Sequence, residues 1–344
     1  MSDRVLVTGL SGFIASHTAL RLLEKGYRIR GTVRNLAKGD RIKTKLLHAS
    51  GADADHLELI EADLGRDAGW ADAVKDCRFI QHIASPLPID PPSEREALVP
   101  EARAGAQRVL ENGFSAGAER IVLTSSIAAM IGQPGRGKTM TFGEEDWSDP
   151  DWKPLPAYPV SKTRAELSAW AYVDAQGLRN RLVSVNPGMV FGPDRFDNAG
   201  ASLQVIKALL NGDLPRAPKI ALPIVDVRDV AAIHIAAMTA KEAGGRRLIA
   251  ASNTLSFKEI ADILRQAYPQ AKKLPKGELP NFILKIFANF DERVNTLLSD
   301  LGTRHEADNG YVSSLTQVIP RPAKEAVLSA AESLIKNGTV KLAT

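Results

Sequence analysis

The chain has 344 residues, of which 44% are apolar and 24% are charged, and its formal net charge at pH 7 is only +4. That length suits one large domain or two ordinary ones, and the apolar fraction is sufficient for a sizeable core. So dilute a charge argues against a protein that binds nucleic acid or a membrane surface, although the sequence pI is near 9.1.

Local features extend these exclusions. The N-terminus opens on a β-like run without a basic and apolar leader, and no stretch approaches the length of a membrane span, so we predict a cytoplasmic protein. A single Cys77 cannot form a disulfide within the chain, and the six histidines lack the spacing of metal ligands. We therefore expect no metal site.

Short apolar strands alternate with helical patterns through the first half of the chain, which is typical of βαβ units. The expected strands span residues 4–8, 28–33, 57–61, 79–83, 120–124 and 181–185. The expected helices span about residues 12–25, 94–116 and 159–175. With right-handed crossovers, this order predicts an α/β fold built on a Rossmann-type doubly wound parallel sheet.

A glycine turn joins the first strand to the first helix, in the run TGLSGFIA from Thr8 to Ala15. Gly9 permits the tight turn, Gly12 lets the backbone approach a pyrophosphate, and Ala15 is small enough for the helix to pack on the strand. The helix N-terminus would offer amide donors and partial positive charge to phosphates. We predict a dinucleotide site whose first contacts are Thr8, Gly9, Ser11, Gly12, Phe13 and Ile14.

The end of the second strand indicates which dinucleotide is bound. NAD sites place a carboxylate there for the ribose 2′-hydroxyl, whereas this chain has Arg34, then Lys38, Arg41 and Lys43. A guanidinium and an ammonium suit a 2′-phosphate, which favours NADP(H), although Lys38 and Arg41 could also face solvent as part of a basic helix start. After the third strand, Asp63 and Leu64 would contact adenine, or Asp63 would cap a helix.

The fifth strand ends at Thr124 and is followed by two hydroxyl-bearing residues, Ser125 and Ser126. The carboxyl end of such a sheet is where ligands bind. A literal match to the phosphate-binding pattern G-x-x-x-x-G-K-[ST] comes next, from Gly132 to Thr139. Such a loop must lead at once into a helix, but residues 140–150 have a loop composition, and Pro223 interrupts the run that could imitate its acidic partner strand. We predict a flexible turn beside the site.

Tyr158 and Lys162 lie one helical turn apart, at the expected start of a helix whose first residue is Pro159. The ammonium can lower the pKa of the phenol by favouring phenolate, and the tyrosine would then work as an acid near neutral pH. Tyr268 and Lys272 have the same spacing, but they end a helix with no serine-bearing strand before them. We interpret that second pair as a surface loop and place the first beside the nicotinamide.

After residue 186 the pattern loosens, with frequent Pro and Gly, amphipathic helices near 203–210 and 257–267, and an irregular tail. A strand-then-helix passage over 224–238 is expected to return to the main sheet. We predict an NADP-binding Rossmann domain over 1–188 that also takes in 223–250. A smaller, interleaved substrate-binding region would comprise 189–222 and 251–344.

These motifs together resemble the extended short-chain dehydrogenases/reductases. The resemblance rests on the glycine turn, the Thr-Ser-Ser strand end, Tyr158-x-x-x-Lys162 followed by Glu166, and the run NPGMVFGP from Asn186 to Pro193. Within that superfamily the chain is most similar to dihydroflavonol reductases, cinnamoyl-CoA reductases and microbial carbonyl or aldehyde reductases. The run GTVR ending at Arg34, the run HIASP from His82 to Pro86 and the run IVDVRDV from Ile224 to Val230 support this branch.

The resemblance implies an NADPH-dependent reductase that transfers hydride to a ketone or aldehyde and forms an alcohol. Tyr158 would protonate the oxygen, Ser126 rather than Ser125 would hold it, and Lys162 would bind the nicotinamide ribose. The resemblance adds further cofactor contacts at Ala84, Ser85, Thr124, Tyr158, Lys162, Pro187, Gly188 and Val190. It implies a substrate pocket lined by Ser85, Pro86, Leu87, Ser126, Met130, Met189 and Val190.

The mostly apolar pocket favours a hydrophobic or aromatic small-molecule carbonyl substrate. Met130 and Ile131 stand where many extended members have a valine-tyrosine pair, which puts sugar-nucleotide substrates in doubt. The alternatives are an NAD-dependent nucleotide-sugar epimerase or dehydratase, against which Arg34 argues, and a non-catalytic NADP-sensing relative. Relatives of the second kind usually lack the tyrosine and lysine. We expect a monomer or homodimer.

Overall fold

The computed structural model describes residues 3–86, 91–135, 137–288 and 290–342. Seven parallel strands form the main sheet, in the order β10-β7-β5-β4-β1-β2-β3. These strands are β1 (Arg4–Val7), β2 (Arg28–Val33), β3 (Leu57–Glu61), β4 (Phe79–His82), β5 (Arg120–Thr124), β7 (Leu182–Pro187) and β10 (Arg247–Ala250). The predicted Rossmann-type sheet is confirmed.

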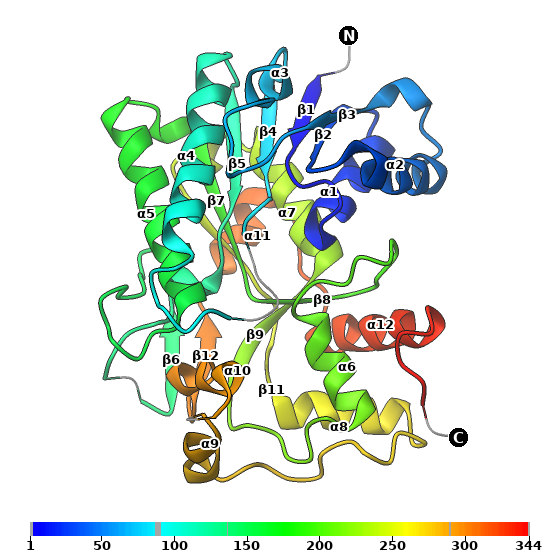
Figure 1. Cartoon of the computed structure of the whole chain (residues 1–344), viewed down its shortest axis with the longest axis vertical. Coiled ribbons are helices and arrows are strands. Elements are labelled where there is room, and N and C mark those ends of the chain that lie inside the picture. Colours follow the sequence, from blue (N-terminus) through cyan, green and yellow to red (C-terminus); the bar gives the residue numbers. More distant parts are fainter. Residues whose placement is uncertain (1–2, 87–90, 136, 289, 343–344) are drawn as a thin grey trace.

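Helices cover both faces of this sheet (Figure 1). One face is covered by α1 (Phe13–Glu24), α2 (Leu36–Ser50) and α7 (Val227–Thr239), and the other by α3 (Trp70–Val74), α4 (Val99–Ser115) and α5 (Ala157–Ala175). Side chains alternate between the two cores: Val5 and Val7 pack with the first group, and Leu6 packs with the second. Because both faces of the central strands are buried, β1 and β5 are mostly apolar along their whole length.

A smaller mixed sheet lies below the main one in Figure 1. It has the order β11-β9-β12-β6, and β8 also pairs with β9. Its strands are β6 (Thr139–Phe142), β8 (Met189–Phe191), β9 (Ala221–Asp226), β11 (Thr254–Ser256) and β12 (Arg304–Ala307). The helices of this part are α6 (Leu203–Asn211), α8 (Phe257–Ala267), α9 (Asn281–Phe287), α10 (Glu292–Asn295), α11 (Gly310–Thr316) and α12 (Ala323–Lys336).

The second half differs from the sequence expectation in three ways. The passage over 224–238 does not return as a unit, because β9 belongs to the smaller sheet and only α7 packs on the main one. Pro223 does not interrupt its strand but pairs with Thr254 inside β9. The tail is not irregular, because α12 buries an apolar face that includes Val327 and Leu334.

Two helix starts also differ from the prediction. Helix α4 begins at Val99 rather than near 94, and α5 begins at Ala157, so Pro159 is its third residue rather than its first. Proline remains compatible with this position, because the first four N–H groups of a helix have no partner within it. Among the described residues, every helix is too short or too polar to cross a membrane.

Candidate active site

Two hollows meet at the carboxyl edge of the main sheet. The first is a cleft of about 620 Å³ that extends from the glycine turn to Tyr158 and Lys162. The second, of about 420 Å³, reaches from Tyr158 toward β9 and the segment before β12. Both are lined by Ser126, Tyr158, Gly188 and Ser202. The residues that the sequence predicts to handle a carbonyl therefore lie at the junction of a long cleft and a rounder pocket.

The glycine turn forms one end of the cleft. Gly9 has a φ of +64°, and a Cβ atom there would lie 2.9 Å from the Cβ atom of Ala84. Its amide donates to the Thr32 hydroxyl at 2.9 Å. Helix α1 then begins at Phe13 with Gly12 as its N-cap, no capping side chain and no acidic residue in its first turn. The amides at this N-terminus remain available to an anion, so the turn fits a dinucleotide pyrophosphate.

Thr8 lies beneath the glycine turn and does not line the cleft. It is fully buried, and its hydroxyl lies 3.0 Å from Nδ1 of His82 while accepting from the amides of Ile83 and Ala84 at 3.0 and 2.9 Å. Because those amides follow β4, this hydroxyl fixes the cleft wall next to the glycine turn.

Arg34 lies at the cleft end of β2 and is exposed. Helix α2 starts two residues later, capped by the side chain of Asn35 and with no acidic residue in its first turn. Lys38 and Arg41 belong to this helix, face solvent and do not contribute to the cleft lining. The guanidinium of Arg34 beside a helix N-terminus is a site suited to a phosphate.

Asp63 and Leu64 line the cleft after β3. The Asp63 carboxylate accepts from the Gly65 amide at 2.9 Å, and the Asp63 carbonyl accepts from the Trp70 indole at 2.9 Å. The alternative of a helix cap does not apply, because α3 has Gly69 as its N-cap. Asp63 therefore shapes a turn in the cleft wall.

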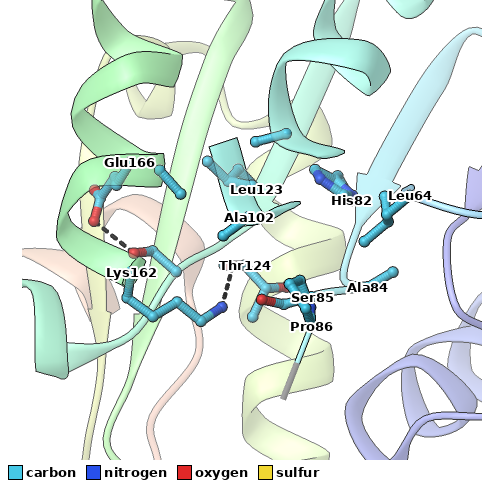
Figure 2. A pocket seen from close by; sticks show the side chains of 13 residues that line it. Leu64, His82, Ala84, Ser85, Pro86, Ala102, Leu123, Thr124, Lys162 and Glu166 are labelled. Atoms are coloured by element: carbon cyan, nitrogen blue, oxygen red, sulfur yellow. Dashed lines mark hydrogen bonds between the residues drawn. The ribbon is translucent and has the colours of Figure 1, made fainter. Parts of the chain in front are cut away.

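Ser126 and Tyr158 are hydrogen-bonded to each other through their side chains at the junction of the two hollows. Ser126 is half-buried, and Lys162 is buried one turn after Tyr158, with its Nζ atom 6.0 Å from the centroid of the phenol ring. Lys162 also donates to the Thr124 carbonyl at 3.4 Å (Figure 2). The structure thus brings together the serine, tyrosine and lysine that the sequence singled out.

The proton affinities of this group differ from the expectation. Burial raises the pKa of Tyr158, and its hydrogen bond with Ser126 only partly opposes that shift. Burial also lowers the pKa of Lys162 to about 8, against the attraction of Glu166. The expected lowering of the Tyr158 pKa by Lys162 is therefore wrong for this structure, in which desolvation of the phenol is the largest influence on that pKa. Tyr158 keeps its proton at neutral pH.

Ser125 is committed to a different partner. Its hydroxyl donates to Glu166 at 2.6 Å, and Ser125 is buried below Ser126. Figure 2 shows Glu166 and Lys162 side by side on α5, with Lys162 reaching toward Thr124. Lys162, Glu166 and His82 line a small hollow of about 20 Å³. Of these two serines, Ser126 is therefore the one that lines the rounder hollow.

The sequence missed the partner of Glu166. Arg247 on β10 donates to the Glu166 carboxylate at 2.8 Å, and both side chains are buried. Asn186 donates to the same carboxylate at 2.9 Å and to the Ser126 carbonyl at 3.2 Å. Arg247 also lies 3.6 Å above the Trp147 ring. Arginine and glutamate 81 residues apart give no local signal.

The predicted cofactor contacts other than Thr8 and Lys38 all line the cleft. In the predicted substrate pocket, Ser126 and Met189 line the rounder hollow, while Ser85, Pro86 and Val190 line the cleft. Met130 lines neither hollow: it is fully buried in a cluster with Phe142 and Ile249. Leu87 lies outside the described residues.

Neither of the two competing motifs forms a second site, although Gly132, where the first one begins, lines the pocket beside Tyr158. The run after Gly132 enters strand β6 at Thr139 instead of a helix, so it lacks the geometry of a phosphate-binding loop; Arg136 within it lies outside the described residues. Tyr268 ends α8 and packs against the edge of the main core, so only Lys272 matches the predicted surface position. Neither Tyr268 nor Lys272 lines a described hollow.

Comparison with known proteins agrees with this arrangement. Residues 5–250 match the model of the NAD dependent epimerase/dehydratase family. The NADPH-dependent methylglyoxal reductase of Saccharomyces cerevisiae is 30% identical over 296 residues, which cover 80% of this chain and 85% of that protein. Cinnamoyl-CoA reductase 1 of Petunia hybrida is 36% identical over 268 residues, which cover 77% and 78%.

A solved structure extends the similarity to the whole chain. The crystal structure of yeast methylglyoxal/isovaleraldehyde reductase complexed with NADPH superposes with a TM-score of 0.78 at 27% identity, covering 98% of this chain and 100% of that one. The glycine turn, the Tyr-x-x-x-Lys pair and these relatives lead to one conclusion. The chain belongs to the NAD-dependent epimerase/dehydratase family, in the branch of extended short-chain dehydrogenases/reductases that contains the methylglyoxal and cinnamoyl-CoA reductases.

Proposed function

We propose that this protein is an NADPH-dependent reductase that transfers hydride to the carbonyl carbon of a ketone or aldehyde and releases an alcohol. The observation that carries the proposal is the position of Tyr158, hydrogen-bonded to Ser126 where the long cleft meets the pocket. The relatives named above are all reductases: an NADPH-dependent methylglyoxal reductase, a cinnamoyl-CoA reductase, and a methylglyoxal/isovaleraldehyde reductase solved with NADPH.

The residues of the cleft fit the cofactor. The uncapped N-terminus of α1 and the close approach at Gly9 suit the pyrophosphate, and Arg34 suits the 2′-phosphate. Asp63 and Leu64 would border the adenine. Lys162 would hold the nicotinamide ribose, with Thr124, Pro187, Gly188 and Val190 around the ring. When bound, NADPH supplies the hydride.

The protein's own residues supply the proton and the orientation. Ser126 and Tyr158 would donate hydrogen bonds to the carbonyl oxygen, which places its carbon toward the cleft. Tyr158 starts protonated because its pKa is raised, so it can pass its proton to the oxygen as negative charge develops there. The Lys162 ammonium then stabilises the phenolate that remains.

The pocket beside Tyr158 favours a hydrophobic substrate. Its wall includes Ile127, Ile131, Leu155, Met189 and Leu222. An aryl or alkyl carbonyl compound would bury apolar surface there, at roughly 25 cal/mol per Å². We propose such a small molecule as the substrate, and a cytoplasmic monomer or homodimer as the working form.

The test is a panel of aromatic ketones, β-keto esters, aldehydes and flavanonols, with NADPH and NADH absorbance followed in parallel. The proposal predicts oxidation of NADPH by at least one class, with the alcohol recovered in equal amount. Tight NADPH binding without oxidation by any class would instead support a sensing role.

Arg34 should decide between the two nicotinamide cofactors. Arg34→Ala removes the charged partner of a 2′-phosphate, so KM for NADPH should rise about 10- to 100-fold, whereas KM for NADH should not change. Steady-state kinetics with both cofactors measure this. Arg41→Ala is the matched control, since that arginine is exposed and does not line the cleft. An equal loss with both cofactors would contradict the role of Arg34.

Lys162 should set the alkaline limit of activity. Its pKa of about 8 means that its ammonium is present below that pH and is lost above it. Without that charge the Tyr158 phenolate is less stable, so kcat/KM should fall as pH rises through about 8. In Lys162→Arg the charge persists, because a guanidinium keeps its proton. A pH profile of that variant should lack the fall, and an unchanged profile would exclude Lys162 as its origin.

We also propose the division of the chain stated from the sequence. Residues 1–188 with 223–250 would bind the cofactor, and 189–222 with 251–344 would bind the substrate. Support comes from β10 and α7, which pack with the main sheet although they lie in the second half.

A further inference from the structure

The pocket beside Tyr158 contains one charged side chain among its described lining residues. Asp300, at the end of the short helix η5 (Leu298–Asp300), lines the pocket with its neighbours Thr296 and Ser299. The rest of the described lining is apolar, glycine or hydroxyl-bearing. Among those described lining residues, Asp300 is the one carboxylate, and no lysine, arginine or histidine stands with it.

Asp300 does not belong to the part of the pocket that is shared with the cofactor cleft. The end that adjoins the cofactor cleft is marked by the residues that line both hollows, among them Ser126 and Tyr158. Asp300 lines the pocket but not the cleft, and it comes from the segment that precedes β12. A substrate with its carbonyl at Tyr158 therefore presents a different part of itself to Asp300.

A buried histidine lies against the carboxylate. Nε2 of His305 lies 3.1 Å from Oδ1 of Asp300, and the exposed fraction of the His305 side chain is 1%. The angles do not make this contact a hydrogen bond, and neither ring nitrogen of His305 has a hydrogen-bond partner among the described residues. His305 is itself fixed in β12, where its carbonyl accepts from the Thr254 hydroxyl at 2.6 Å.

The carboxylate thus keeps acceptor capacity on the pocket side. Its other polar contact with the described part of the chain is a long hydrogen bond of 3.4 Å from Ser299 to Oδ2, and 23% of the side chain is exposed. An ionised carboxylate accepts hydrogen bonds and donates none. A ligand that fills the pocket removes water from this group and must replace it with a donor, because a desolvated charge without a partner is costly.

We propose that Asp300, beside His305 in the part of the pocket that is not shared with the cofactor cleft, is a specificity-determining residue that selects carbonyl substrates carrying a hydroxyl group remote from the carbonyl and rejects those carrying a carboxylate. The inference rests on the proposed reductase function, since it assumes that the carbonyl lies at Tyr158. Among hydrophobic carbonyl compounds, Asp300 would then discriminate by a second functional group. A hydroxyl donates to Asp300, a methoxy group of similar shape only accepts, and a carboxylate is repelled.

The experiment compares three ring substituents, a hydroxyl, a methoxy group and a carboxylate. Each is placed on two carbonyl compounds, benzaldehyde and 4-phenylbutan-2-one. Hydroxyl should exceed methoxy in kcat/KM by about ten-fold or more, as expected for a hydrogen bond to a charged group, and carboxylate should be the poorest. In Asp300→Ala the hydroxyl preference should vanish. In Asp300→Asn, which keeps the size and an acceptor oxygen, the carboxylate compounds should gain most. Asp308→Asn, an exposed carboxylate outside the pocket lining, is the control and should change nothing.

A binding measurement separates this inference from the proposed function. The corresponding alcohols form unreactive complexes with the NADPH-loaded protein, and their dissociation constants are measured by titration calorimetry. Tighter binding of hydroxyl than methoxy alcohols in the unaltered protein, lost in Asp300→Ala, supports the role of Asp300 whatever the turnover. Equal binding of the two, or failure of both to bind, overturns it. Normal reduction of unsubstituted aldehydes in that case would leave the reductase function standing.

Discussion

Tyr158→Phe is expected to lower kcat by about 10²- to 10⁴-fold while the dissociation constant of NADPH stays unchanged. The change deletes one hydroxyl, the group that would protonate the substrate oxygen and that is hydrogen-bonded to Ser126. The ring itself is retained, so the cleft wall and the packing at the start of α5 persist. Single-turnover kinetics with NADPH in excess measure the chemical step, and fluorescence titration measures cofactor binding.

The chain contains its own control for this experiment. Tyr268 precedes Lys272 by the same spacing but ends α8, away from every described hollow. Tyr268→Phe should leave kcat unchanged. If Tyr158→Phe turned over at the unaltered rate, the acid would have to be another group. If it lost NADPH binding as well, Tyr158 would act on the cofactor rather than on the proton.

Arg247→Met is expected to lower the free energy of unfolding by about 3–5 kcal/mol, because it leaves the Glu166 carboxylate buried without its countercharge. Both partners are almost wholly buried, and Arg247 holds the pKa of Glu166 below its usual range although burial opposes this. Methionine keeps much of the apolar volume, so the loss reflects the charge and its hydrogen bonds. Urea unfolding followed by tryptophan fluorescence measures it.

Arg179→Met tests the same substitution at an exposed ion pair. Arg179 pairs with Asp174 at 2.8 Å, but about half of each side chain is exposed. Such pairs contribute about 0–1 kcal/mol, so unfolding should hardly change. A loss below about 1 kcal/mol in Arg247→Met would mean that Glu166 takes up a proton or reaches water once its partner is removed.

The main sheet could be predicted because its strands are local signals. β2, β3 and β5 have the predicted bounds, since each is a short segment with apolar residues that lies between helical patterns. The smaller sheet could not be predicted in this way. Its strands have three to six residues each, and each becomes a strand only by pairing with a distant segment. Helix α12 was missed because its buried face is rich in alanine, which contrasts weakly with the polar face.

The candidate site divides along the same line. The glycine turn, Arg34, Tyr158 and Lys162 were found because each motif is contiguous and belongs to a strand end or a helix start. Arg247 and Asp300 were missed because their surroundings depend on contacts between distant segments. Met130 shows the converse limit: an apolar residue near the site can face the pocket or the core, and only packing decides.

The pairing of β6 with β12 also imposes an order on folding. Strand β6 ends at Phe142, but its parallel partner begins only at Arg304. During synthesis, the strands and helices of the nucleotide half can collapse while β6 still presents an unpaired edge, and closing so long a loop is slow. The pocket beside Tyr158, which needs Asp300 from just before β12, therefore cannot be complete until this late segment has been made. A nascent chain would be able to bind NADPH before its substrate pocket was complete.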